Sequence, residues 1–202
     1  MTEINLLFSI DDRYVEQFKT TLYSVYLNTL STLLHVFVLQ KQLLEKNAEI
    51  EDFCAALGII YEPVVIGEKA FEDAPSTDRY PETIYYRLLA HEYLPQDLDR
   101  ILYLDADILC LNDICPLYEM ELGASLYVAA SHGSDDNMTD LVNKMRLQNF
   151  EAESYYNSGV LLMNLTEIRR EVKRDAILDY IAQNSFKLFL PDQDVLNALY
   201  GH

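Results

Sequence analysis

The chain has 202 residues, of which 50% are hydrophobic and 24% are charged, a balance typical of one globular domain with a sizeable core. Its 15 Lys and Arg residues against 33 Asp and Glu residues give a net charge of −18. Such a chain repels nucleic acid and anionic lipid surfaces, which argues against DNA binding and against a polybasic membrane role.

The predicted elements alternate along the chain between short apolar runs and segments of helical period. Strands are expected at residues 4–10, 34–39, 59–65, 100–104, 126–130 and 159–165. Helices are expected at residues 15–26, 43–57, 84–94 and 168–181, with Gly58 ending the second, and loops at 67–81 and 131–137. Strands separated by helices predict an α/β fold, here one domain over residues 1–202, with a mostly parallel central sheet flanked by helices.

The N-terminal sequence has no basic stretch and no apolar run of the length of a signal peptide or membrane span. The three cysteines, Cys54, Cys110 and Cys115, lack the paired spacing of zinc ligands. We therefore expect reduced thiols in a cytoplasmic protein without an integral membrane segment.

Polar residues stand where the predicted strands end, and ligands of open α/β sheets bind outside the carboxyl ends of strands. Asp11-Asp12, Asp105-Ala106-Asp107 and Ser131-His132 follow the first, fourth and fifth strands, and Tyr156-Asn157-Ser158 precedes the sixth. None of these places has a glycine-rich phosphate loop. Any phosphate that binds there needs a partner other than backbone amides.

Asp105 and Asp107 follow an apolar strand directly. In an extended chain, side chains at i and i+2 point to the same side, so the two carboxylates are expected to converge. Two close anions require a cation or a shared proton between them, and oxygen ligands favour Mn²⁺ or Mg²⁺. The alternative is a turn in which Asp105 caps a helix and Asp107 faces solvent.

The segment Arg100–Asp107, with the sequence RILYLDAD, resembles the metal motif of glycosyltransferase family 8. Further segments that resemble the family follow its order: Phe8–Tyr14, Tyr85–Leu88, Tyr156–Leu165 and Leu190–Asn197, the last containing D-Q-D-x-x-N. The resemblance covers nearly the whole chain. It implies a GT-A-like nucleotide-sugar-binding fold and a retaining, metal-dependent hexosyltransferase. The donor would be a UDP-sugar carrying galactose or glucose, and the acceptor a hydroxyl on a glycan, lipid-linked saccharide or glycoprotein.

The resemblance also implies a role for each matching residue. Asp105 and Asp107 would bind Mn²⁺ or Mg²⁺, and the nucleotide-sugar would contact Ser9, Asp11, Tyr14, Arg87, Asp105, Ala106, Asp107, Asn157, Ser158, Asp192 and Gln193. Asp192, Gln193 and Asn157 would lie at the reacting sugar. Gln193 occupies the position expected for a nucleophile, and because an amide is a poor nucleophile, front-face attack with the departing phosphate as base is favoured.

Ordinary structural roles remain open for several of these positions. The alternatives are Asp12 as the N-cap of the first helix, Tyr14 in the core, Arg87 as a solvated charge, residues 157–159 as a turn, and Asp192 as the N-cap of the last helix. His35, His91 and His132 have no ligand spacing and are interpreted as structural.

The family's C-terminal H-x-x-G-x-x-K-P-W segment, which carries the third metal ligand, has no match here, and His202 falls too early to replace it. We therefore expect a C-terminally incomplete site with weak donor binding and slow transfer. A non-catalytic UDP-sugar-binding module and a UDP-sugar hydrolase are the alternatives, and an uncovered apolar surface would favour self-association.

Overall fold

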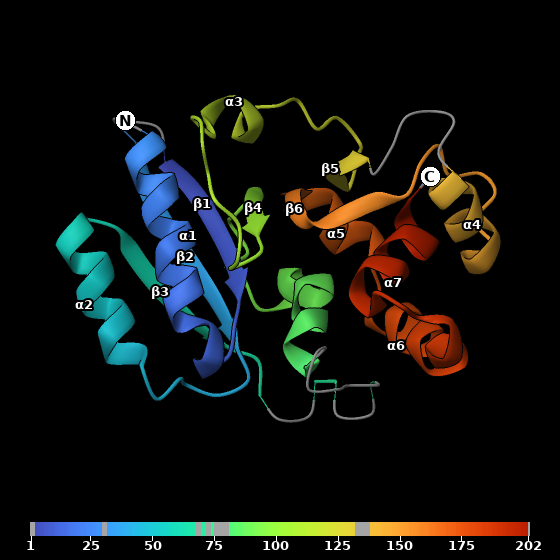
Figure 1. Ribbon diagram of the computed structural model, residues 1–202, viewed down its shortest axis with the longest axis horizontal. Helices are drawn as coiled ribbons and strands as arrows, with labels where there is room; N and C mark the ends of the chain where they lie inside the picture. Colours follow the sequence, from blue (N-terminus) through green and yellow to red (C-terminus); the bar gives the residue numbers. More distant parts are fainter. Residues whose placement is uncertain are drawn as a thin grey trace.

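The computed structural model describes residues 3–29, 32–67, 70–71, 74, 81–131 and 138–201. Within these residues, six strands form one sheet in the order β3-β2-β1-β4-β6-β5 (Figure 1). The strands are β1 (Glu3–Ser9), β2 (Leu33–Gln40), β3 (Ile60–Val65), β4 (Arg100–Leu104), β5 (Tyr127–Ser131) and β6 (Tyr156–Asn164). β1 to β4 are parallel, whereas β6 runs antiparallel to both β4 and β5. The mostly parallel α/β sheet is thus confirmed.

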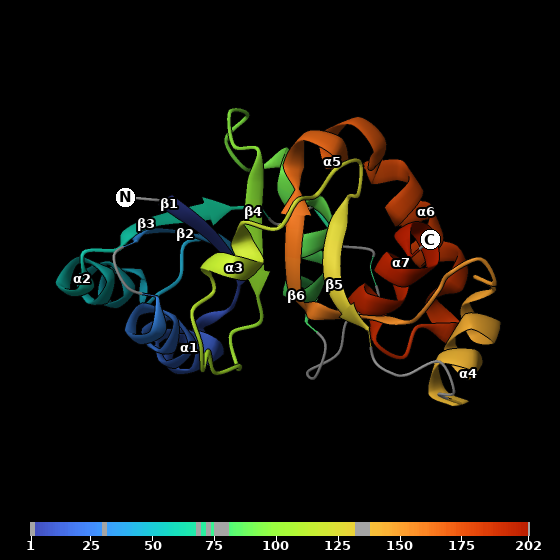
Figure 2. The same cartoon turned by 90° about the horizontal axis from the view of Figure 1, so that it is seen from above.

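Helices cover both faces of this sheet. α1 (Val15–Asn28), α2 (Asn47–Leu57) and the short α3 (Cys115–Tyr118) pack against one face. The 3₁₀ helix η2 (Glu82–Glu92), α5 (Leu165–Glu171), α6 (Arg174–Asn184) and α7 (Pro191–Tyr200) pack against the other. α4 (Met138–Leu147) contacts α7, and the 3₁₀ turns η1 (Asp12–Tyr14) and η3 (Ser185–Lys187) precede α1 and α7. Figure 2 shows α1 and α2 beside β1 to β3, and α5 to α7 beside β5 and β6.

The central strands are apolar on both faces because both faces are covered. In β1, Leu6 and Phe8 belong to the core under α1 and α2, while Leu7 belongs to the core under η2 and α5. Each of these three side chains is fully buried. This is the pattern of a parallel strand between two helical layers, and it explains why continuous apolar runs predicted the strands correctly.

Other local predictions need correction. β6 begins at Tyr156, before the predicted start at residue 159, so the alternative of a turn at residues 157–159 is wrong, and Ser131 of β5 pairs with Tyr156. The helix expected at 168–181 is two helices, because Val172 and Lys173 have extended backbone. The helix expected at 84–94 is the 3₁₀ helix η2, whose backbone kinks at Leu89. Helices α3 and α4 were not predicted.

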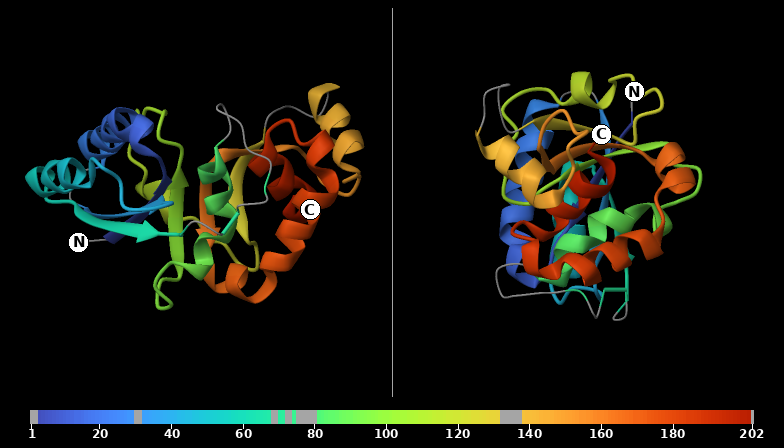
Figure 3. Two further views of the ribbon diagram at one scale, coloured as in Figure 1. Left: turned by 90° about the horizontal axis from the view of Figure 1, so that it is seen from below. Right: turned by 90° about the vertical axis from the view of Figure 1, so that its right-hand side faces the viewer.

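Gly58 ends α2 with a φ of 70°, in the left-handed region that glycine adopts without penalty, as expected from the sequence. The expected loops at 67–81 and 131–137 fall largely outside the described residues, as does His132. No helix in the described part of the chain combines the length and apolarity needed to cross a membrane. β1 to β3 with α1 and α2 lie at one end of the molecule, and α4 to α7 lie at the other, with β4 between them (Figure 3).

Candidate active site

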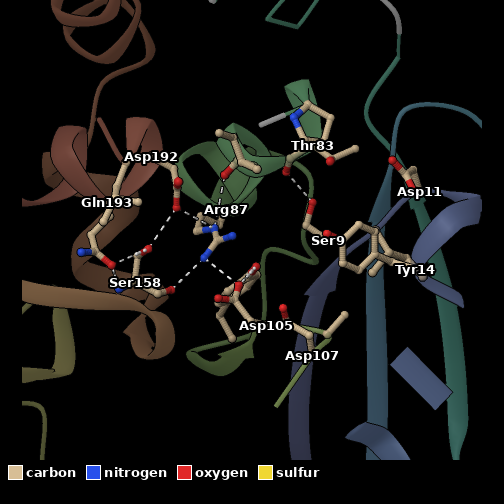
Figure 4. Close-up of a pocket in the computed structure, with 16 residues that line it drawn as sticks. Ser9, Asp11, Tyr14, Thr83, Arg87, Asp105, Asp107, Ser158, Asp192 and Gln193 are labelled. Atoms are coloured by element: carbon tan, nitrogen blue, oxygen red, sulfur yellow. Dashed lines mark hydrogen bonds and ion pairs between the residues drawn. The ribbon is translucent and has the colours of Figure 1, made fainter. Parts of the chain in front are cut away.

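A cavity opens where the carboxyl ends of β1 and β4 meet the start of β6 and of α7 (Figure 4). It is lined by Ser9, Ile10, Asp11, Tyr14, Pro81, Thr83, Ile84, Arg87, Tyr103, Asp105, Ala106, Asp107, Ser158, Leu190, Asp192 and Gln193. Every residue that the sequence placed at the nucleotide-sugar lines this cavity except Asn157. Residues from segments far apart in the sequence therefore lie together at the carboxyl ends of the strands, where ligands of open α/β sheets bind.

Arg87 lies at the centre of this group and is only 7% exposed. Its guanidinium donates to the carbonyl of Ser158 at 2.8 Å and forms ion pairs with Asp105 at 3.0 Å and Asp192 at 3.3 Å. Its Cζ lies 4.2 Å from the centre of the Tyr103 ring. Burial alone lowers the pKa of the guanidinium, but the two carboxylates outweigh it and raise the pKa above the ordinary value. Arg87 is thus a buried, paired cation, and its interpretation as a solvated charge is wrong.

Asp105 follows the last residue of β4 and is held by several contacts. Its amide donates to the carbonyl of Gly159 at 2.8 Å, and its Oδ1 accepts from the Tyr103 hydroxyl at 2.8 Å. Its side chain is 35% exposed, and Asp107 is exposed at the same cavity. No helix begins at Asp105, so its interpretation as a helix cap is wrong.

The backbone differs from the expected geometry at this point, because Ala106 and Asp107 lie in a turn. The Ala106 carbonyl accepts from the Thr21 hydroxyl of α1 at 2.7 Å, which fixes that turn. The two carboxylates reach the same cavity through the turn and not through a continued strand.

Few side chains among the described residues could bind a metal ion at this cavity. These residues contain no cluster of three or more His, Cys, Asp or Glu side chains suited to a metal ion. Asp105 and Asp107 supply carboxylate oxygens, which fit a hard divalent ion such as Mn²⁺ or Mg²⁺. Its remaining ligands would have to come from a bound diphosphate, from water or from further protein groups.

Ser158, Asp192 and Gln193 form the other wall of the cavity, and each is at most 7% exposed. The Ser158 hydroxyl donates to Asp192 at 3.0 Å, and its amide donates to Oε1 of Gln193 at 3.0 Å. Burial raises the pKa of the Asp192 carboxyl, although Arg87 and the Ser158 hydroxyl oppose the shift. The start of β6 and the start of α7 are therefore joined by buried side chains.

Asp192 does not cap α7, contrary to the alternative interpretation. The N-cap position is Leu190, which has no side-chain cap, and the carboxylate of Asp194 accepts the amides of Phe189 and Leu190 at 2.7 and 3.1 Å. Asp194 also binds Arg146 of α4 at 2.6 Å. The side chain of Asp192 is thereby left to the cavity.

Asp11, and not Asp12 as the alternative had it, caps the start of the first helical segment. Asp11 caps the turn η1, because its carboxylate accepts the amide of Arg13 at 2.9 Å and pairs with the Arg13 guanidinium at 2.7 Å. Asp12 instead accepts the amide of Lys46 at 3.2 Å. Asp11 still lines the cavity, so the cap and a ligand contact are compatible at this residue.

Two further predicted contacts lie at the same end of the cavity. Tyr14 is 38% exposed and lines the cavity, so it is not a core residue. The Ser9 hydroxyl donates to the carbonyl of Thr83 at 2.6 Å, which joins β1 to η2. Asn157 is not among the residues that line the cavity, and its Oδ1 accepts the amide of Gly159 at 2.7 Å.

The sequence interpretation missed some residues that line the cavity, above all Tyr103. Tyr103 lies two positions before Asp105, a spacing typical of the same strand face, but within an apolar run it carries no signal that distinguishes it from a core aromatic residue. Thr83 and Leu190 carry no comparable signal, because the first follows an irregular loop and the second precedes a helix. His35 and His91, which were interpreted as structural, do not line the cavity.

Residues 5–202 match the family description "Glycosyl transferase family 8". The chain belongs to this family.

Known members are similar over most of this chain. A lipopolysaccharide 1,2-glucosyltransferase of Escherichia coli is 31% identical over 162 residues, covering 77% of this chain and 47% of the relative. A second, from Escherichia coli strain K12, is 27% identical over 201 residues, covering 97% of this chain and 58% of the relative. This family 8 chain thus spans about half the length of the curated relatives it matches.

The fold is similar to that of the galactosyltransferase LgtC, solved in complex with donor and acceptor sugar analogs. The superposition covers 98% of this chain and 70% of the LgtC chain. The TM-score is 0.84 at 27% sequence identity. This agreement confirms the GT-A-like fold expected of a family 8 member.

Proposed function

We propose that this chain transfers a hexose, galactose or glucose, from a UDP-sugar to a hydroxyl of a saccharide acceptor with retention of anomeric configuration. The observation that carries the proposal is the cavity around Arg87, which joins residues from every segment resembling the family. The names of the relatives, lipopolysaccharide glucosyltransferases and a galactosyltransferase, support the choice of hexose. A glycan, a lipid-linked saccharide or a glycoprotein would serve as acceptor.

The two ends of the cavity suit the two ends of such a donor. The nucleoside would bind near Ser9, Asp11 and Tyr14, where an aromatic face is partly exposed for stacking on a base. The sugar would bind near Asp192 and Gln193, where buried amide and carboxylate groups can hydrogen-bond to its hydroxyls.

The diphosphate would then lie between these ends, at Asp105 and Asp107. A chain of charge −18 repels a nucleotide, so carboxylates at this position make sense if they hold a divalent cation. Bound there, Mn²⁺ or Mg²⁺ supplies positive charge to the leaving diphosphate. Arg87 provides a second cation at the same place, fixed before any ligand arrives.

In the proposed reaction, the bond between the anomeric carbon and the diphosphate oxygen breaks while the acceptor oxygen bonds to the same face. The acceptor proton passes to the departing phosphate. Gln193 supports this route over a covalent intermediate, because an amide whose Oε1 accepts from Ser158 is a poor nucleophile. Asp192 lies beside it with a raised pKa, held by Arg87 and Ser158, and its role would be to bind the sugar.

The test measures UDP release from UDP-glucose and UDP-galactose, with and without a saccharide acceptor and with Mn²⁺ or a chelator. The proposal expects release that requires both the acceptor and the metal, and UDP binding by calorimetry that is lost in chelator. Release without acceptor would identify a hydrolase, and binding without release would identify a non-catalytic module. Equal UDP affinity in Mn²⁺ and in chelator would refute the bridging ion.

A further inference from the structure

Tyr103 touches both charged groups that the proposed function places at the diphosphate. We propose that Tyr103 is a positioning residue, which fixes the Asp105 carboxylate and the Arg87 guanidinium in the geometry that takes up the metal and the diphosphate together. The inference rests on the proposed function, since it concerns how the same site is held in order.

The first contact is a hydrogen bond. The Tyr103 hydroxyl donates to Oδ1 of Asp105 at 2.8 Å, and Arg87 Nη1 lies 3.0 Å from the same oxygen. The other oxygen, Oδ2, lies so close to Gly159 that a Cβ atom added to this glycine would be only 2.6 Å from it. Rotation of the carboxylate would break both contacts to Oδ1 and press against the β6 backbone. The carboxylate is therefore held in one orientation.

The second contact is made by the ring. The Arg87 guanidinium lies over it at 4.2 Å, within the range of a cation–π interaction, and the ring is only 1% exposed. Because Tyr103 is buried in the core under η2 and α5, its ring in turn limits where the guanidinium can lie. One side chain thus sets the relative position of the cation and the carboxylate.

Packing alone does not explain a tyrosine at this position. Its neighbours in β4, Ile101, Leu102 and Leu104, are apolar and buried, and a phenylalanine would fill almost the same volume. Tyr103 instead borders the cavity, and its hydroxyl donates to Asp105.

The experiment compares Tyr103→Phe, which removes only the hydroxyl, with Tyr103→Leu, which also removes the ring. Tyr118→Phe is the matched control, because the Tyr118 hydroxyl is similarly buried and accepts from Asn5 at 3.1 Å, on the sheet face opposite Arg87. Mn²⁺ binding in the presence of UDP is followed by electron paramagnetic resonance, and UDP binding in the presence of Mn²⁺ by calorimetry.

Tyr103→Phe should weaken Mn²⁺ binding by on the order of 10-fold, the usual effect of losing a group that orients a metal ligand, and Tyr103→Leu should weaken it further. Tyr118→Phe should bind as the wild type does, whatever its melting temperature. Unchanged binding by Tyr103→Phe, or equal losses in both phenylalanine variants, would show that Tyr103 only packs. If the wild-type chain binds neither Mn²⁺ nor UDP, the proposed function fails together with this inference.

Discussion

Gly159 offers the sharpest test of the arrangement around Asp105. A Cβ atom added at this glycine would lie 2.6 Å from Oδ2 and 3.3 Å from Cγ of Asp105. Ordinary carbon–oxygen contacts begin at about 3.3 Å, so the carboxylate would have to withdraw by about 0.7 Å. Gly159→Ala therefore displaces the proposed metal ligand without changing its charge.

The displacement acts on short contacts. The Tyr103 hydroxyl and Arg87 bind Oδ1 at 2.8 and 3.0 Å, and a shift of this size stretches one or both beyond good hydrogen-bond geometry. A hydrogen bond to a charged group contributes about 1.5–3 kcal/mol, so we expect Gly159→Ala to weaken Mn²⁺-dependent UDP binding about 10- to 100-fold. Gly159 does not need a left-handed backbone, so the alanine itself adds little strain.

The assay is calorimetry of UDP binding at saturating Mn²⁺, run as a double-mutant cycle with Asp105→Asn. Because both changes act on one carboxylate, Gly159→Ala should have little further effect once Asp105 has been replaced. Wild-type affinity in Gly159→Ala would refute the role of Asp105, and additive losses would show that the glycine acts through another group.

Three further predictions concern the buried charges. Arg87→Met should lower the free energy of unfolding by about 3–5 kcal/mol in urea titrations, because it leaves Asp192 buried without its cation; a loss below 1 kcal/mol would contradict this. Asp105→Asn should lower the melting temperature of the metal-free chain whereas Asp107→Asn should not, since of these two residues Asp105 is the one that pairs with Arg87, and both should weaken metal-dependent UDP binding in calorimetry. Asp192 has a raised pKa, so its contribution to stability is complete below the ordinary pKa of 3.8 and is lost as pH rises through the folded-state pKa. Asp192→Asn should therefore gain stability relative to the wild type as pH rises from 3.8, and a difference that stays constant with pH would refute the shift.

The sequence was sufficient for the parts of the fold in which one signal dominates. Continuous apolar runs predicted β1, β2 and β4 because these strands are largely buried on both faces, and Gly58 predicted the end of α2. It was insufficient where tertiary contacts decide. β6 begins at Tyr156 because pairing with β5 extends it, and α5 and α6 separate at residues whose sequence continues a helical period.

For the cavity, too, the sequence was sufficient for some features and insufficient for others. Most of the residues that the motifs named lie around one cavity, but the motifs did not show which contacts each residue would make. Asp11 and Asp12 are equally good caps by residue type, and only the path of the chain toward Lys46 assigns the cap to Asp11. Tyr103 could not be distinguished from a core aromatic residue in the sequence. Its hydroxyl has a functional partner only because the chain after β4 places Asp105 beside it.

The strand order has a consequence for how the chain folds. β5 joins the sheet only through β6, although β5 is synthesised first and the described helix α4 lies between the two in sequence. Until β6 emerges, β4 is therefore an open edge, and such edges promote aggregation of partly folded chains. The insertion of β6 closes that edge and also delivers Ser158 to Arg87. The insertion of β6 thus protects the nascent sheet and at the same time delivers one part of the binding cavity, whereas Asp192 and Gln193 follow later in the chain on α7.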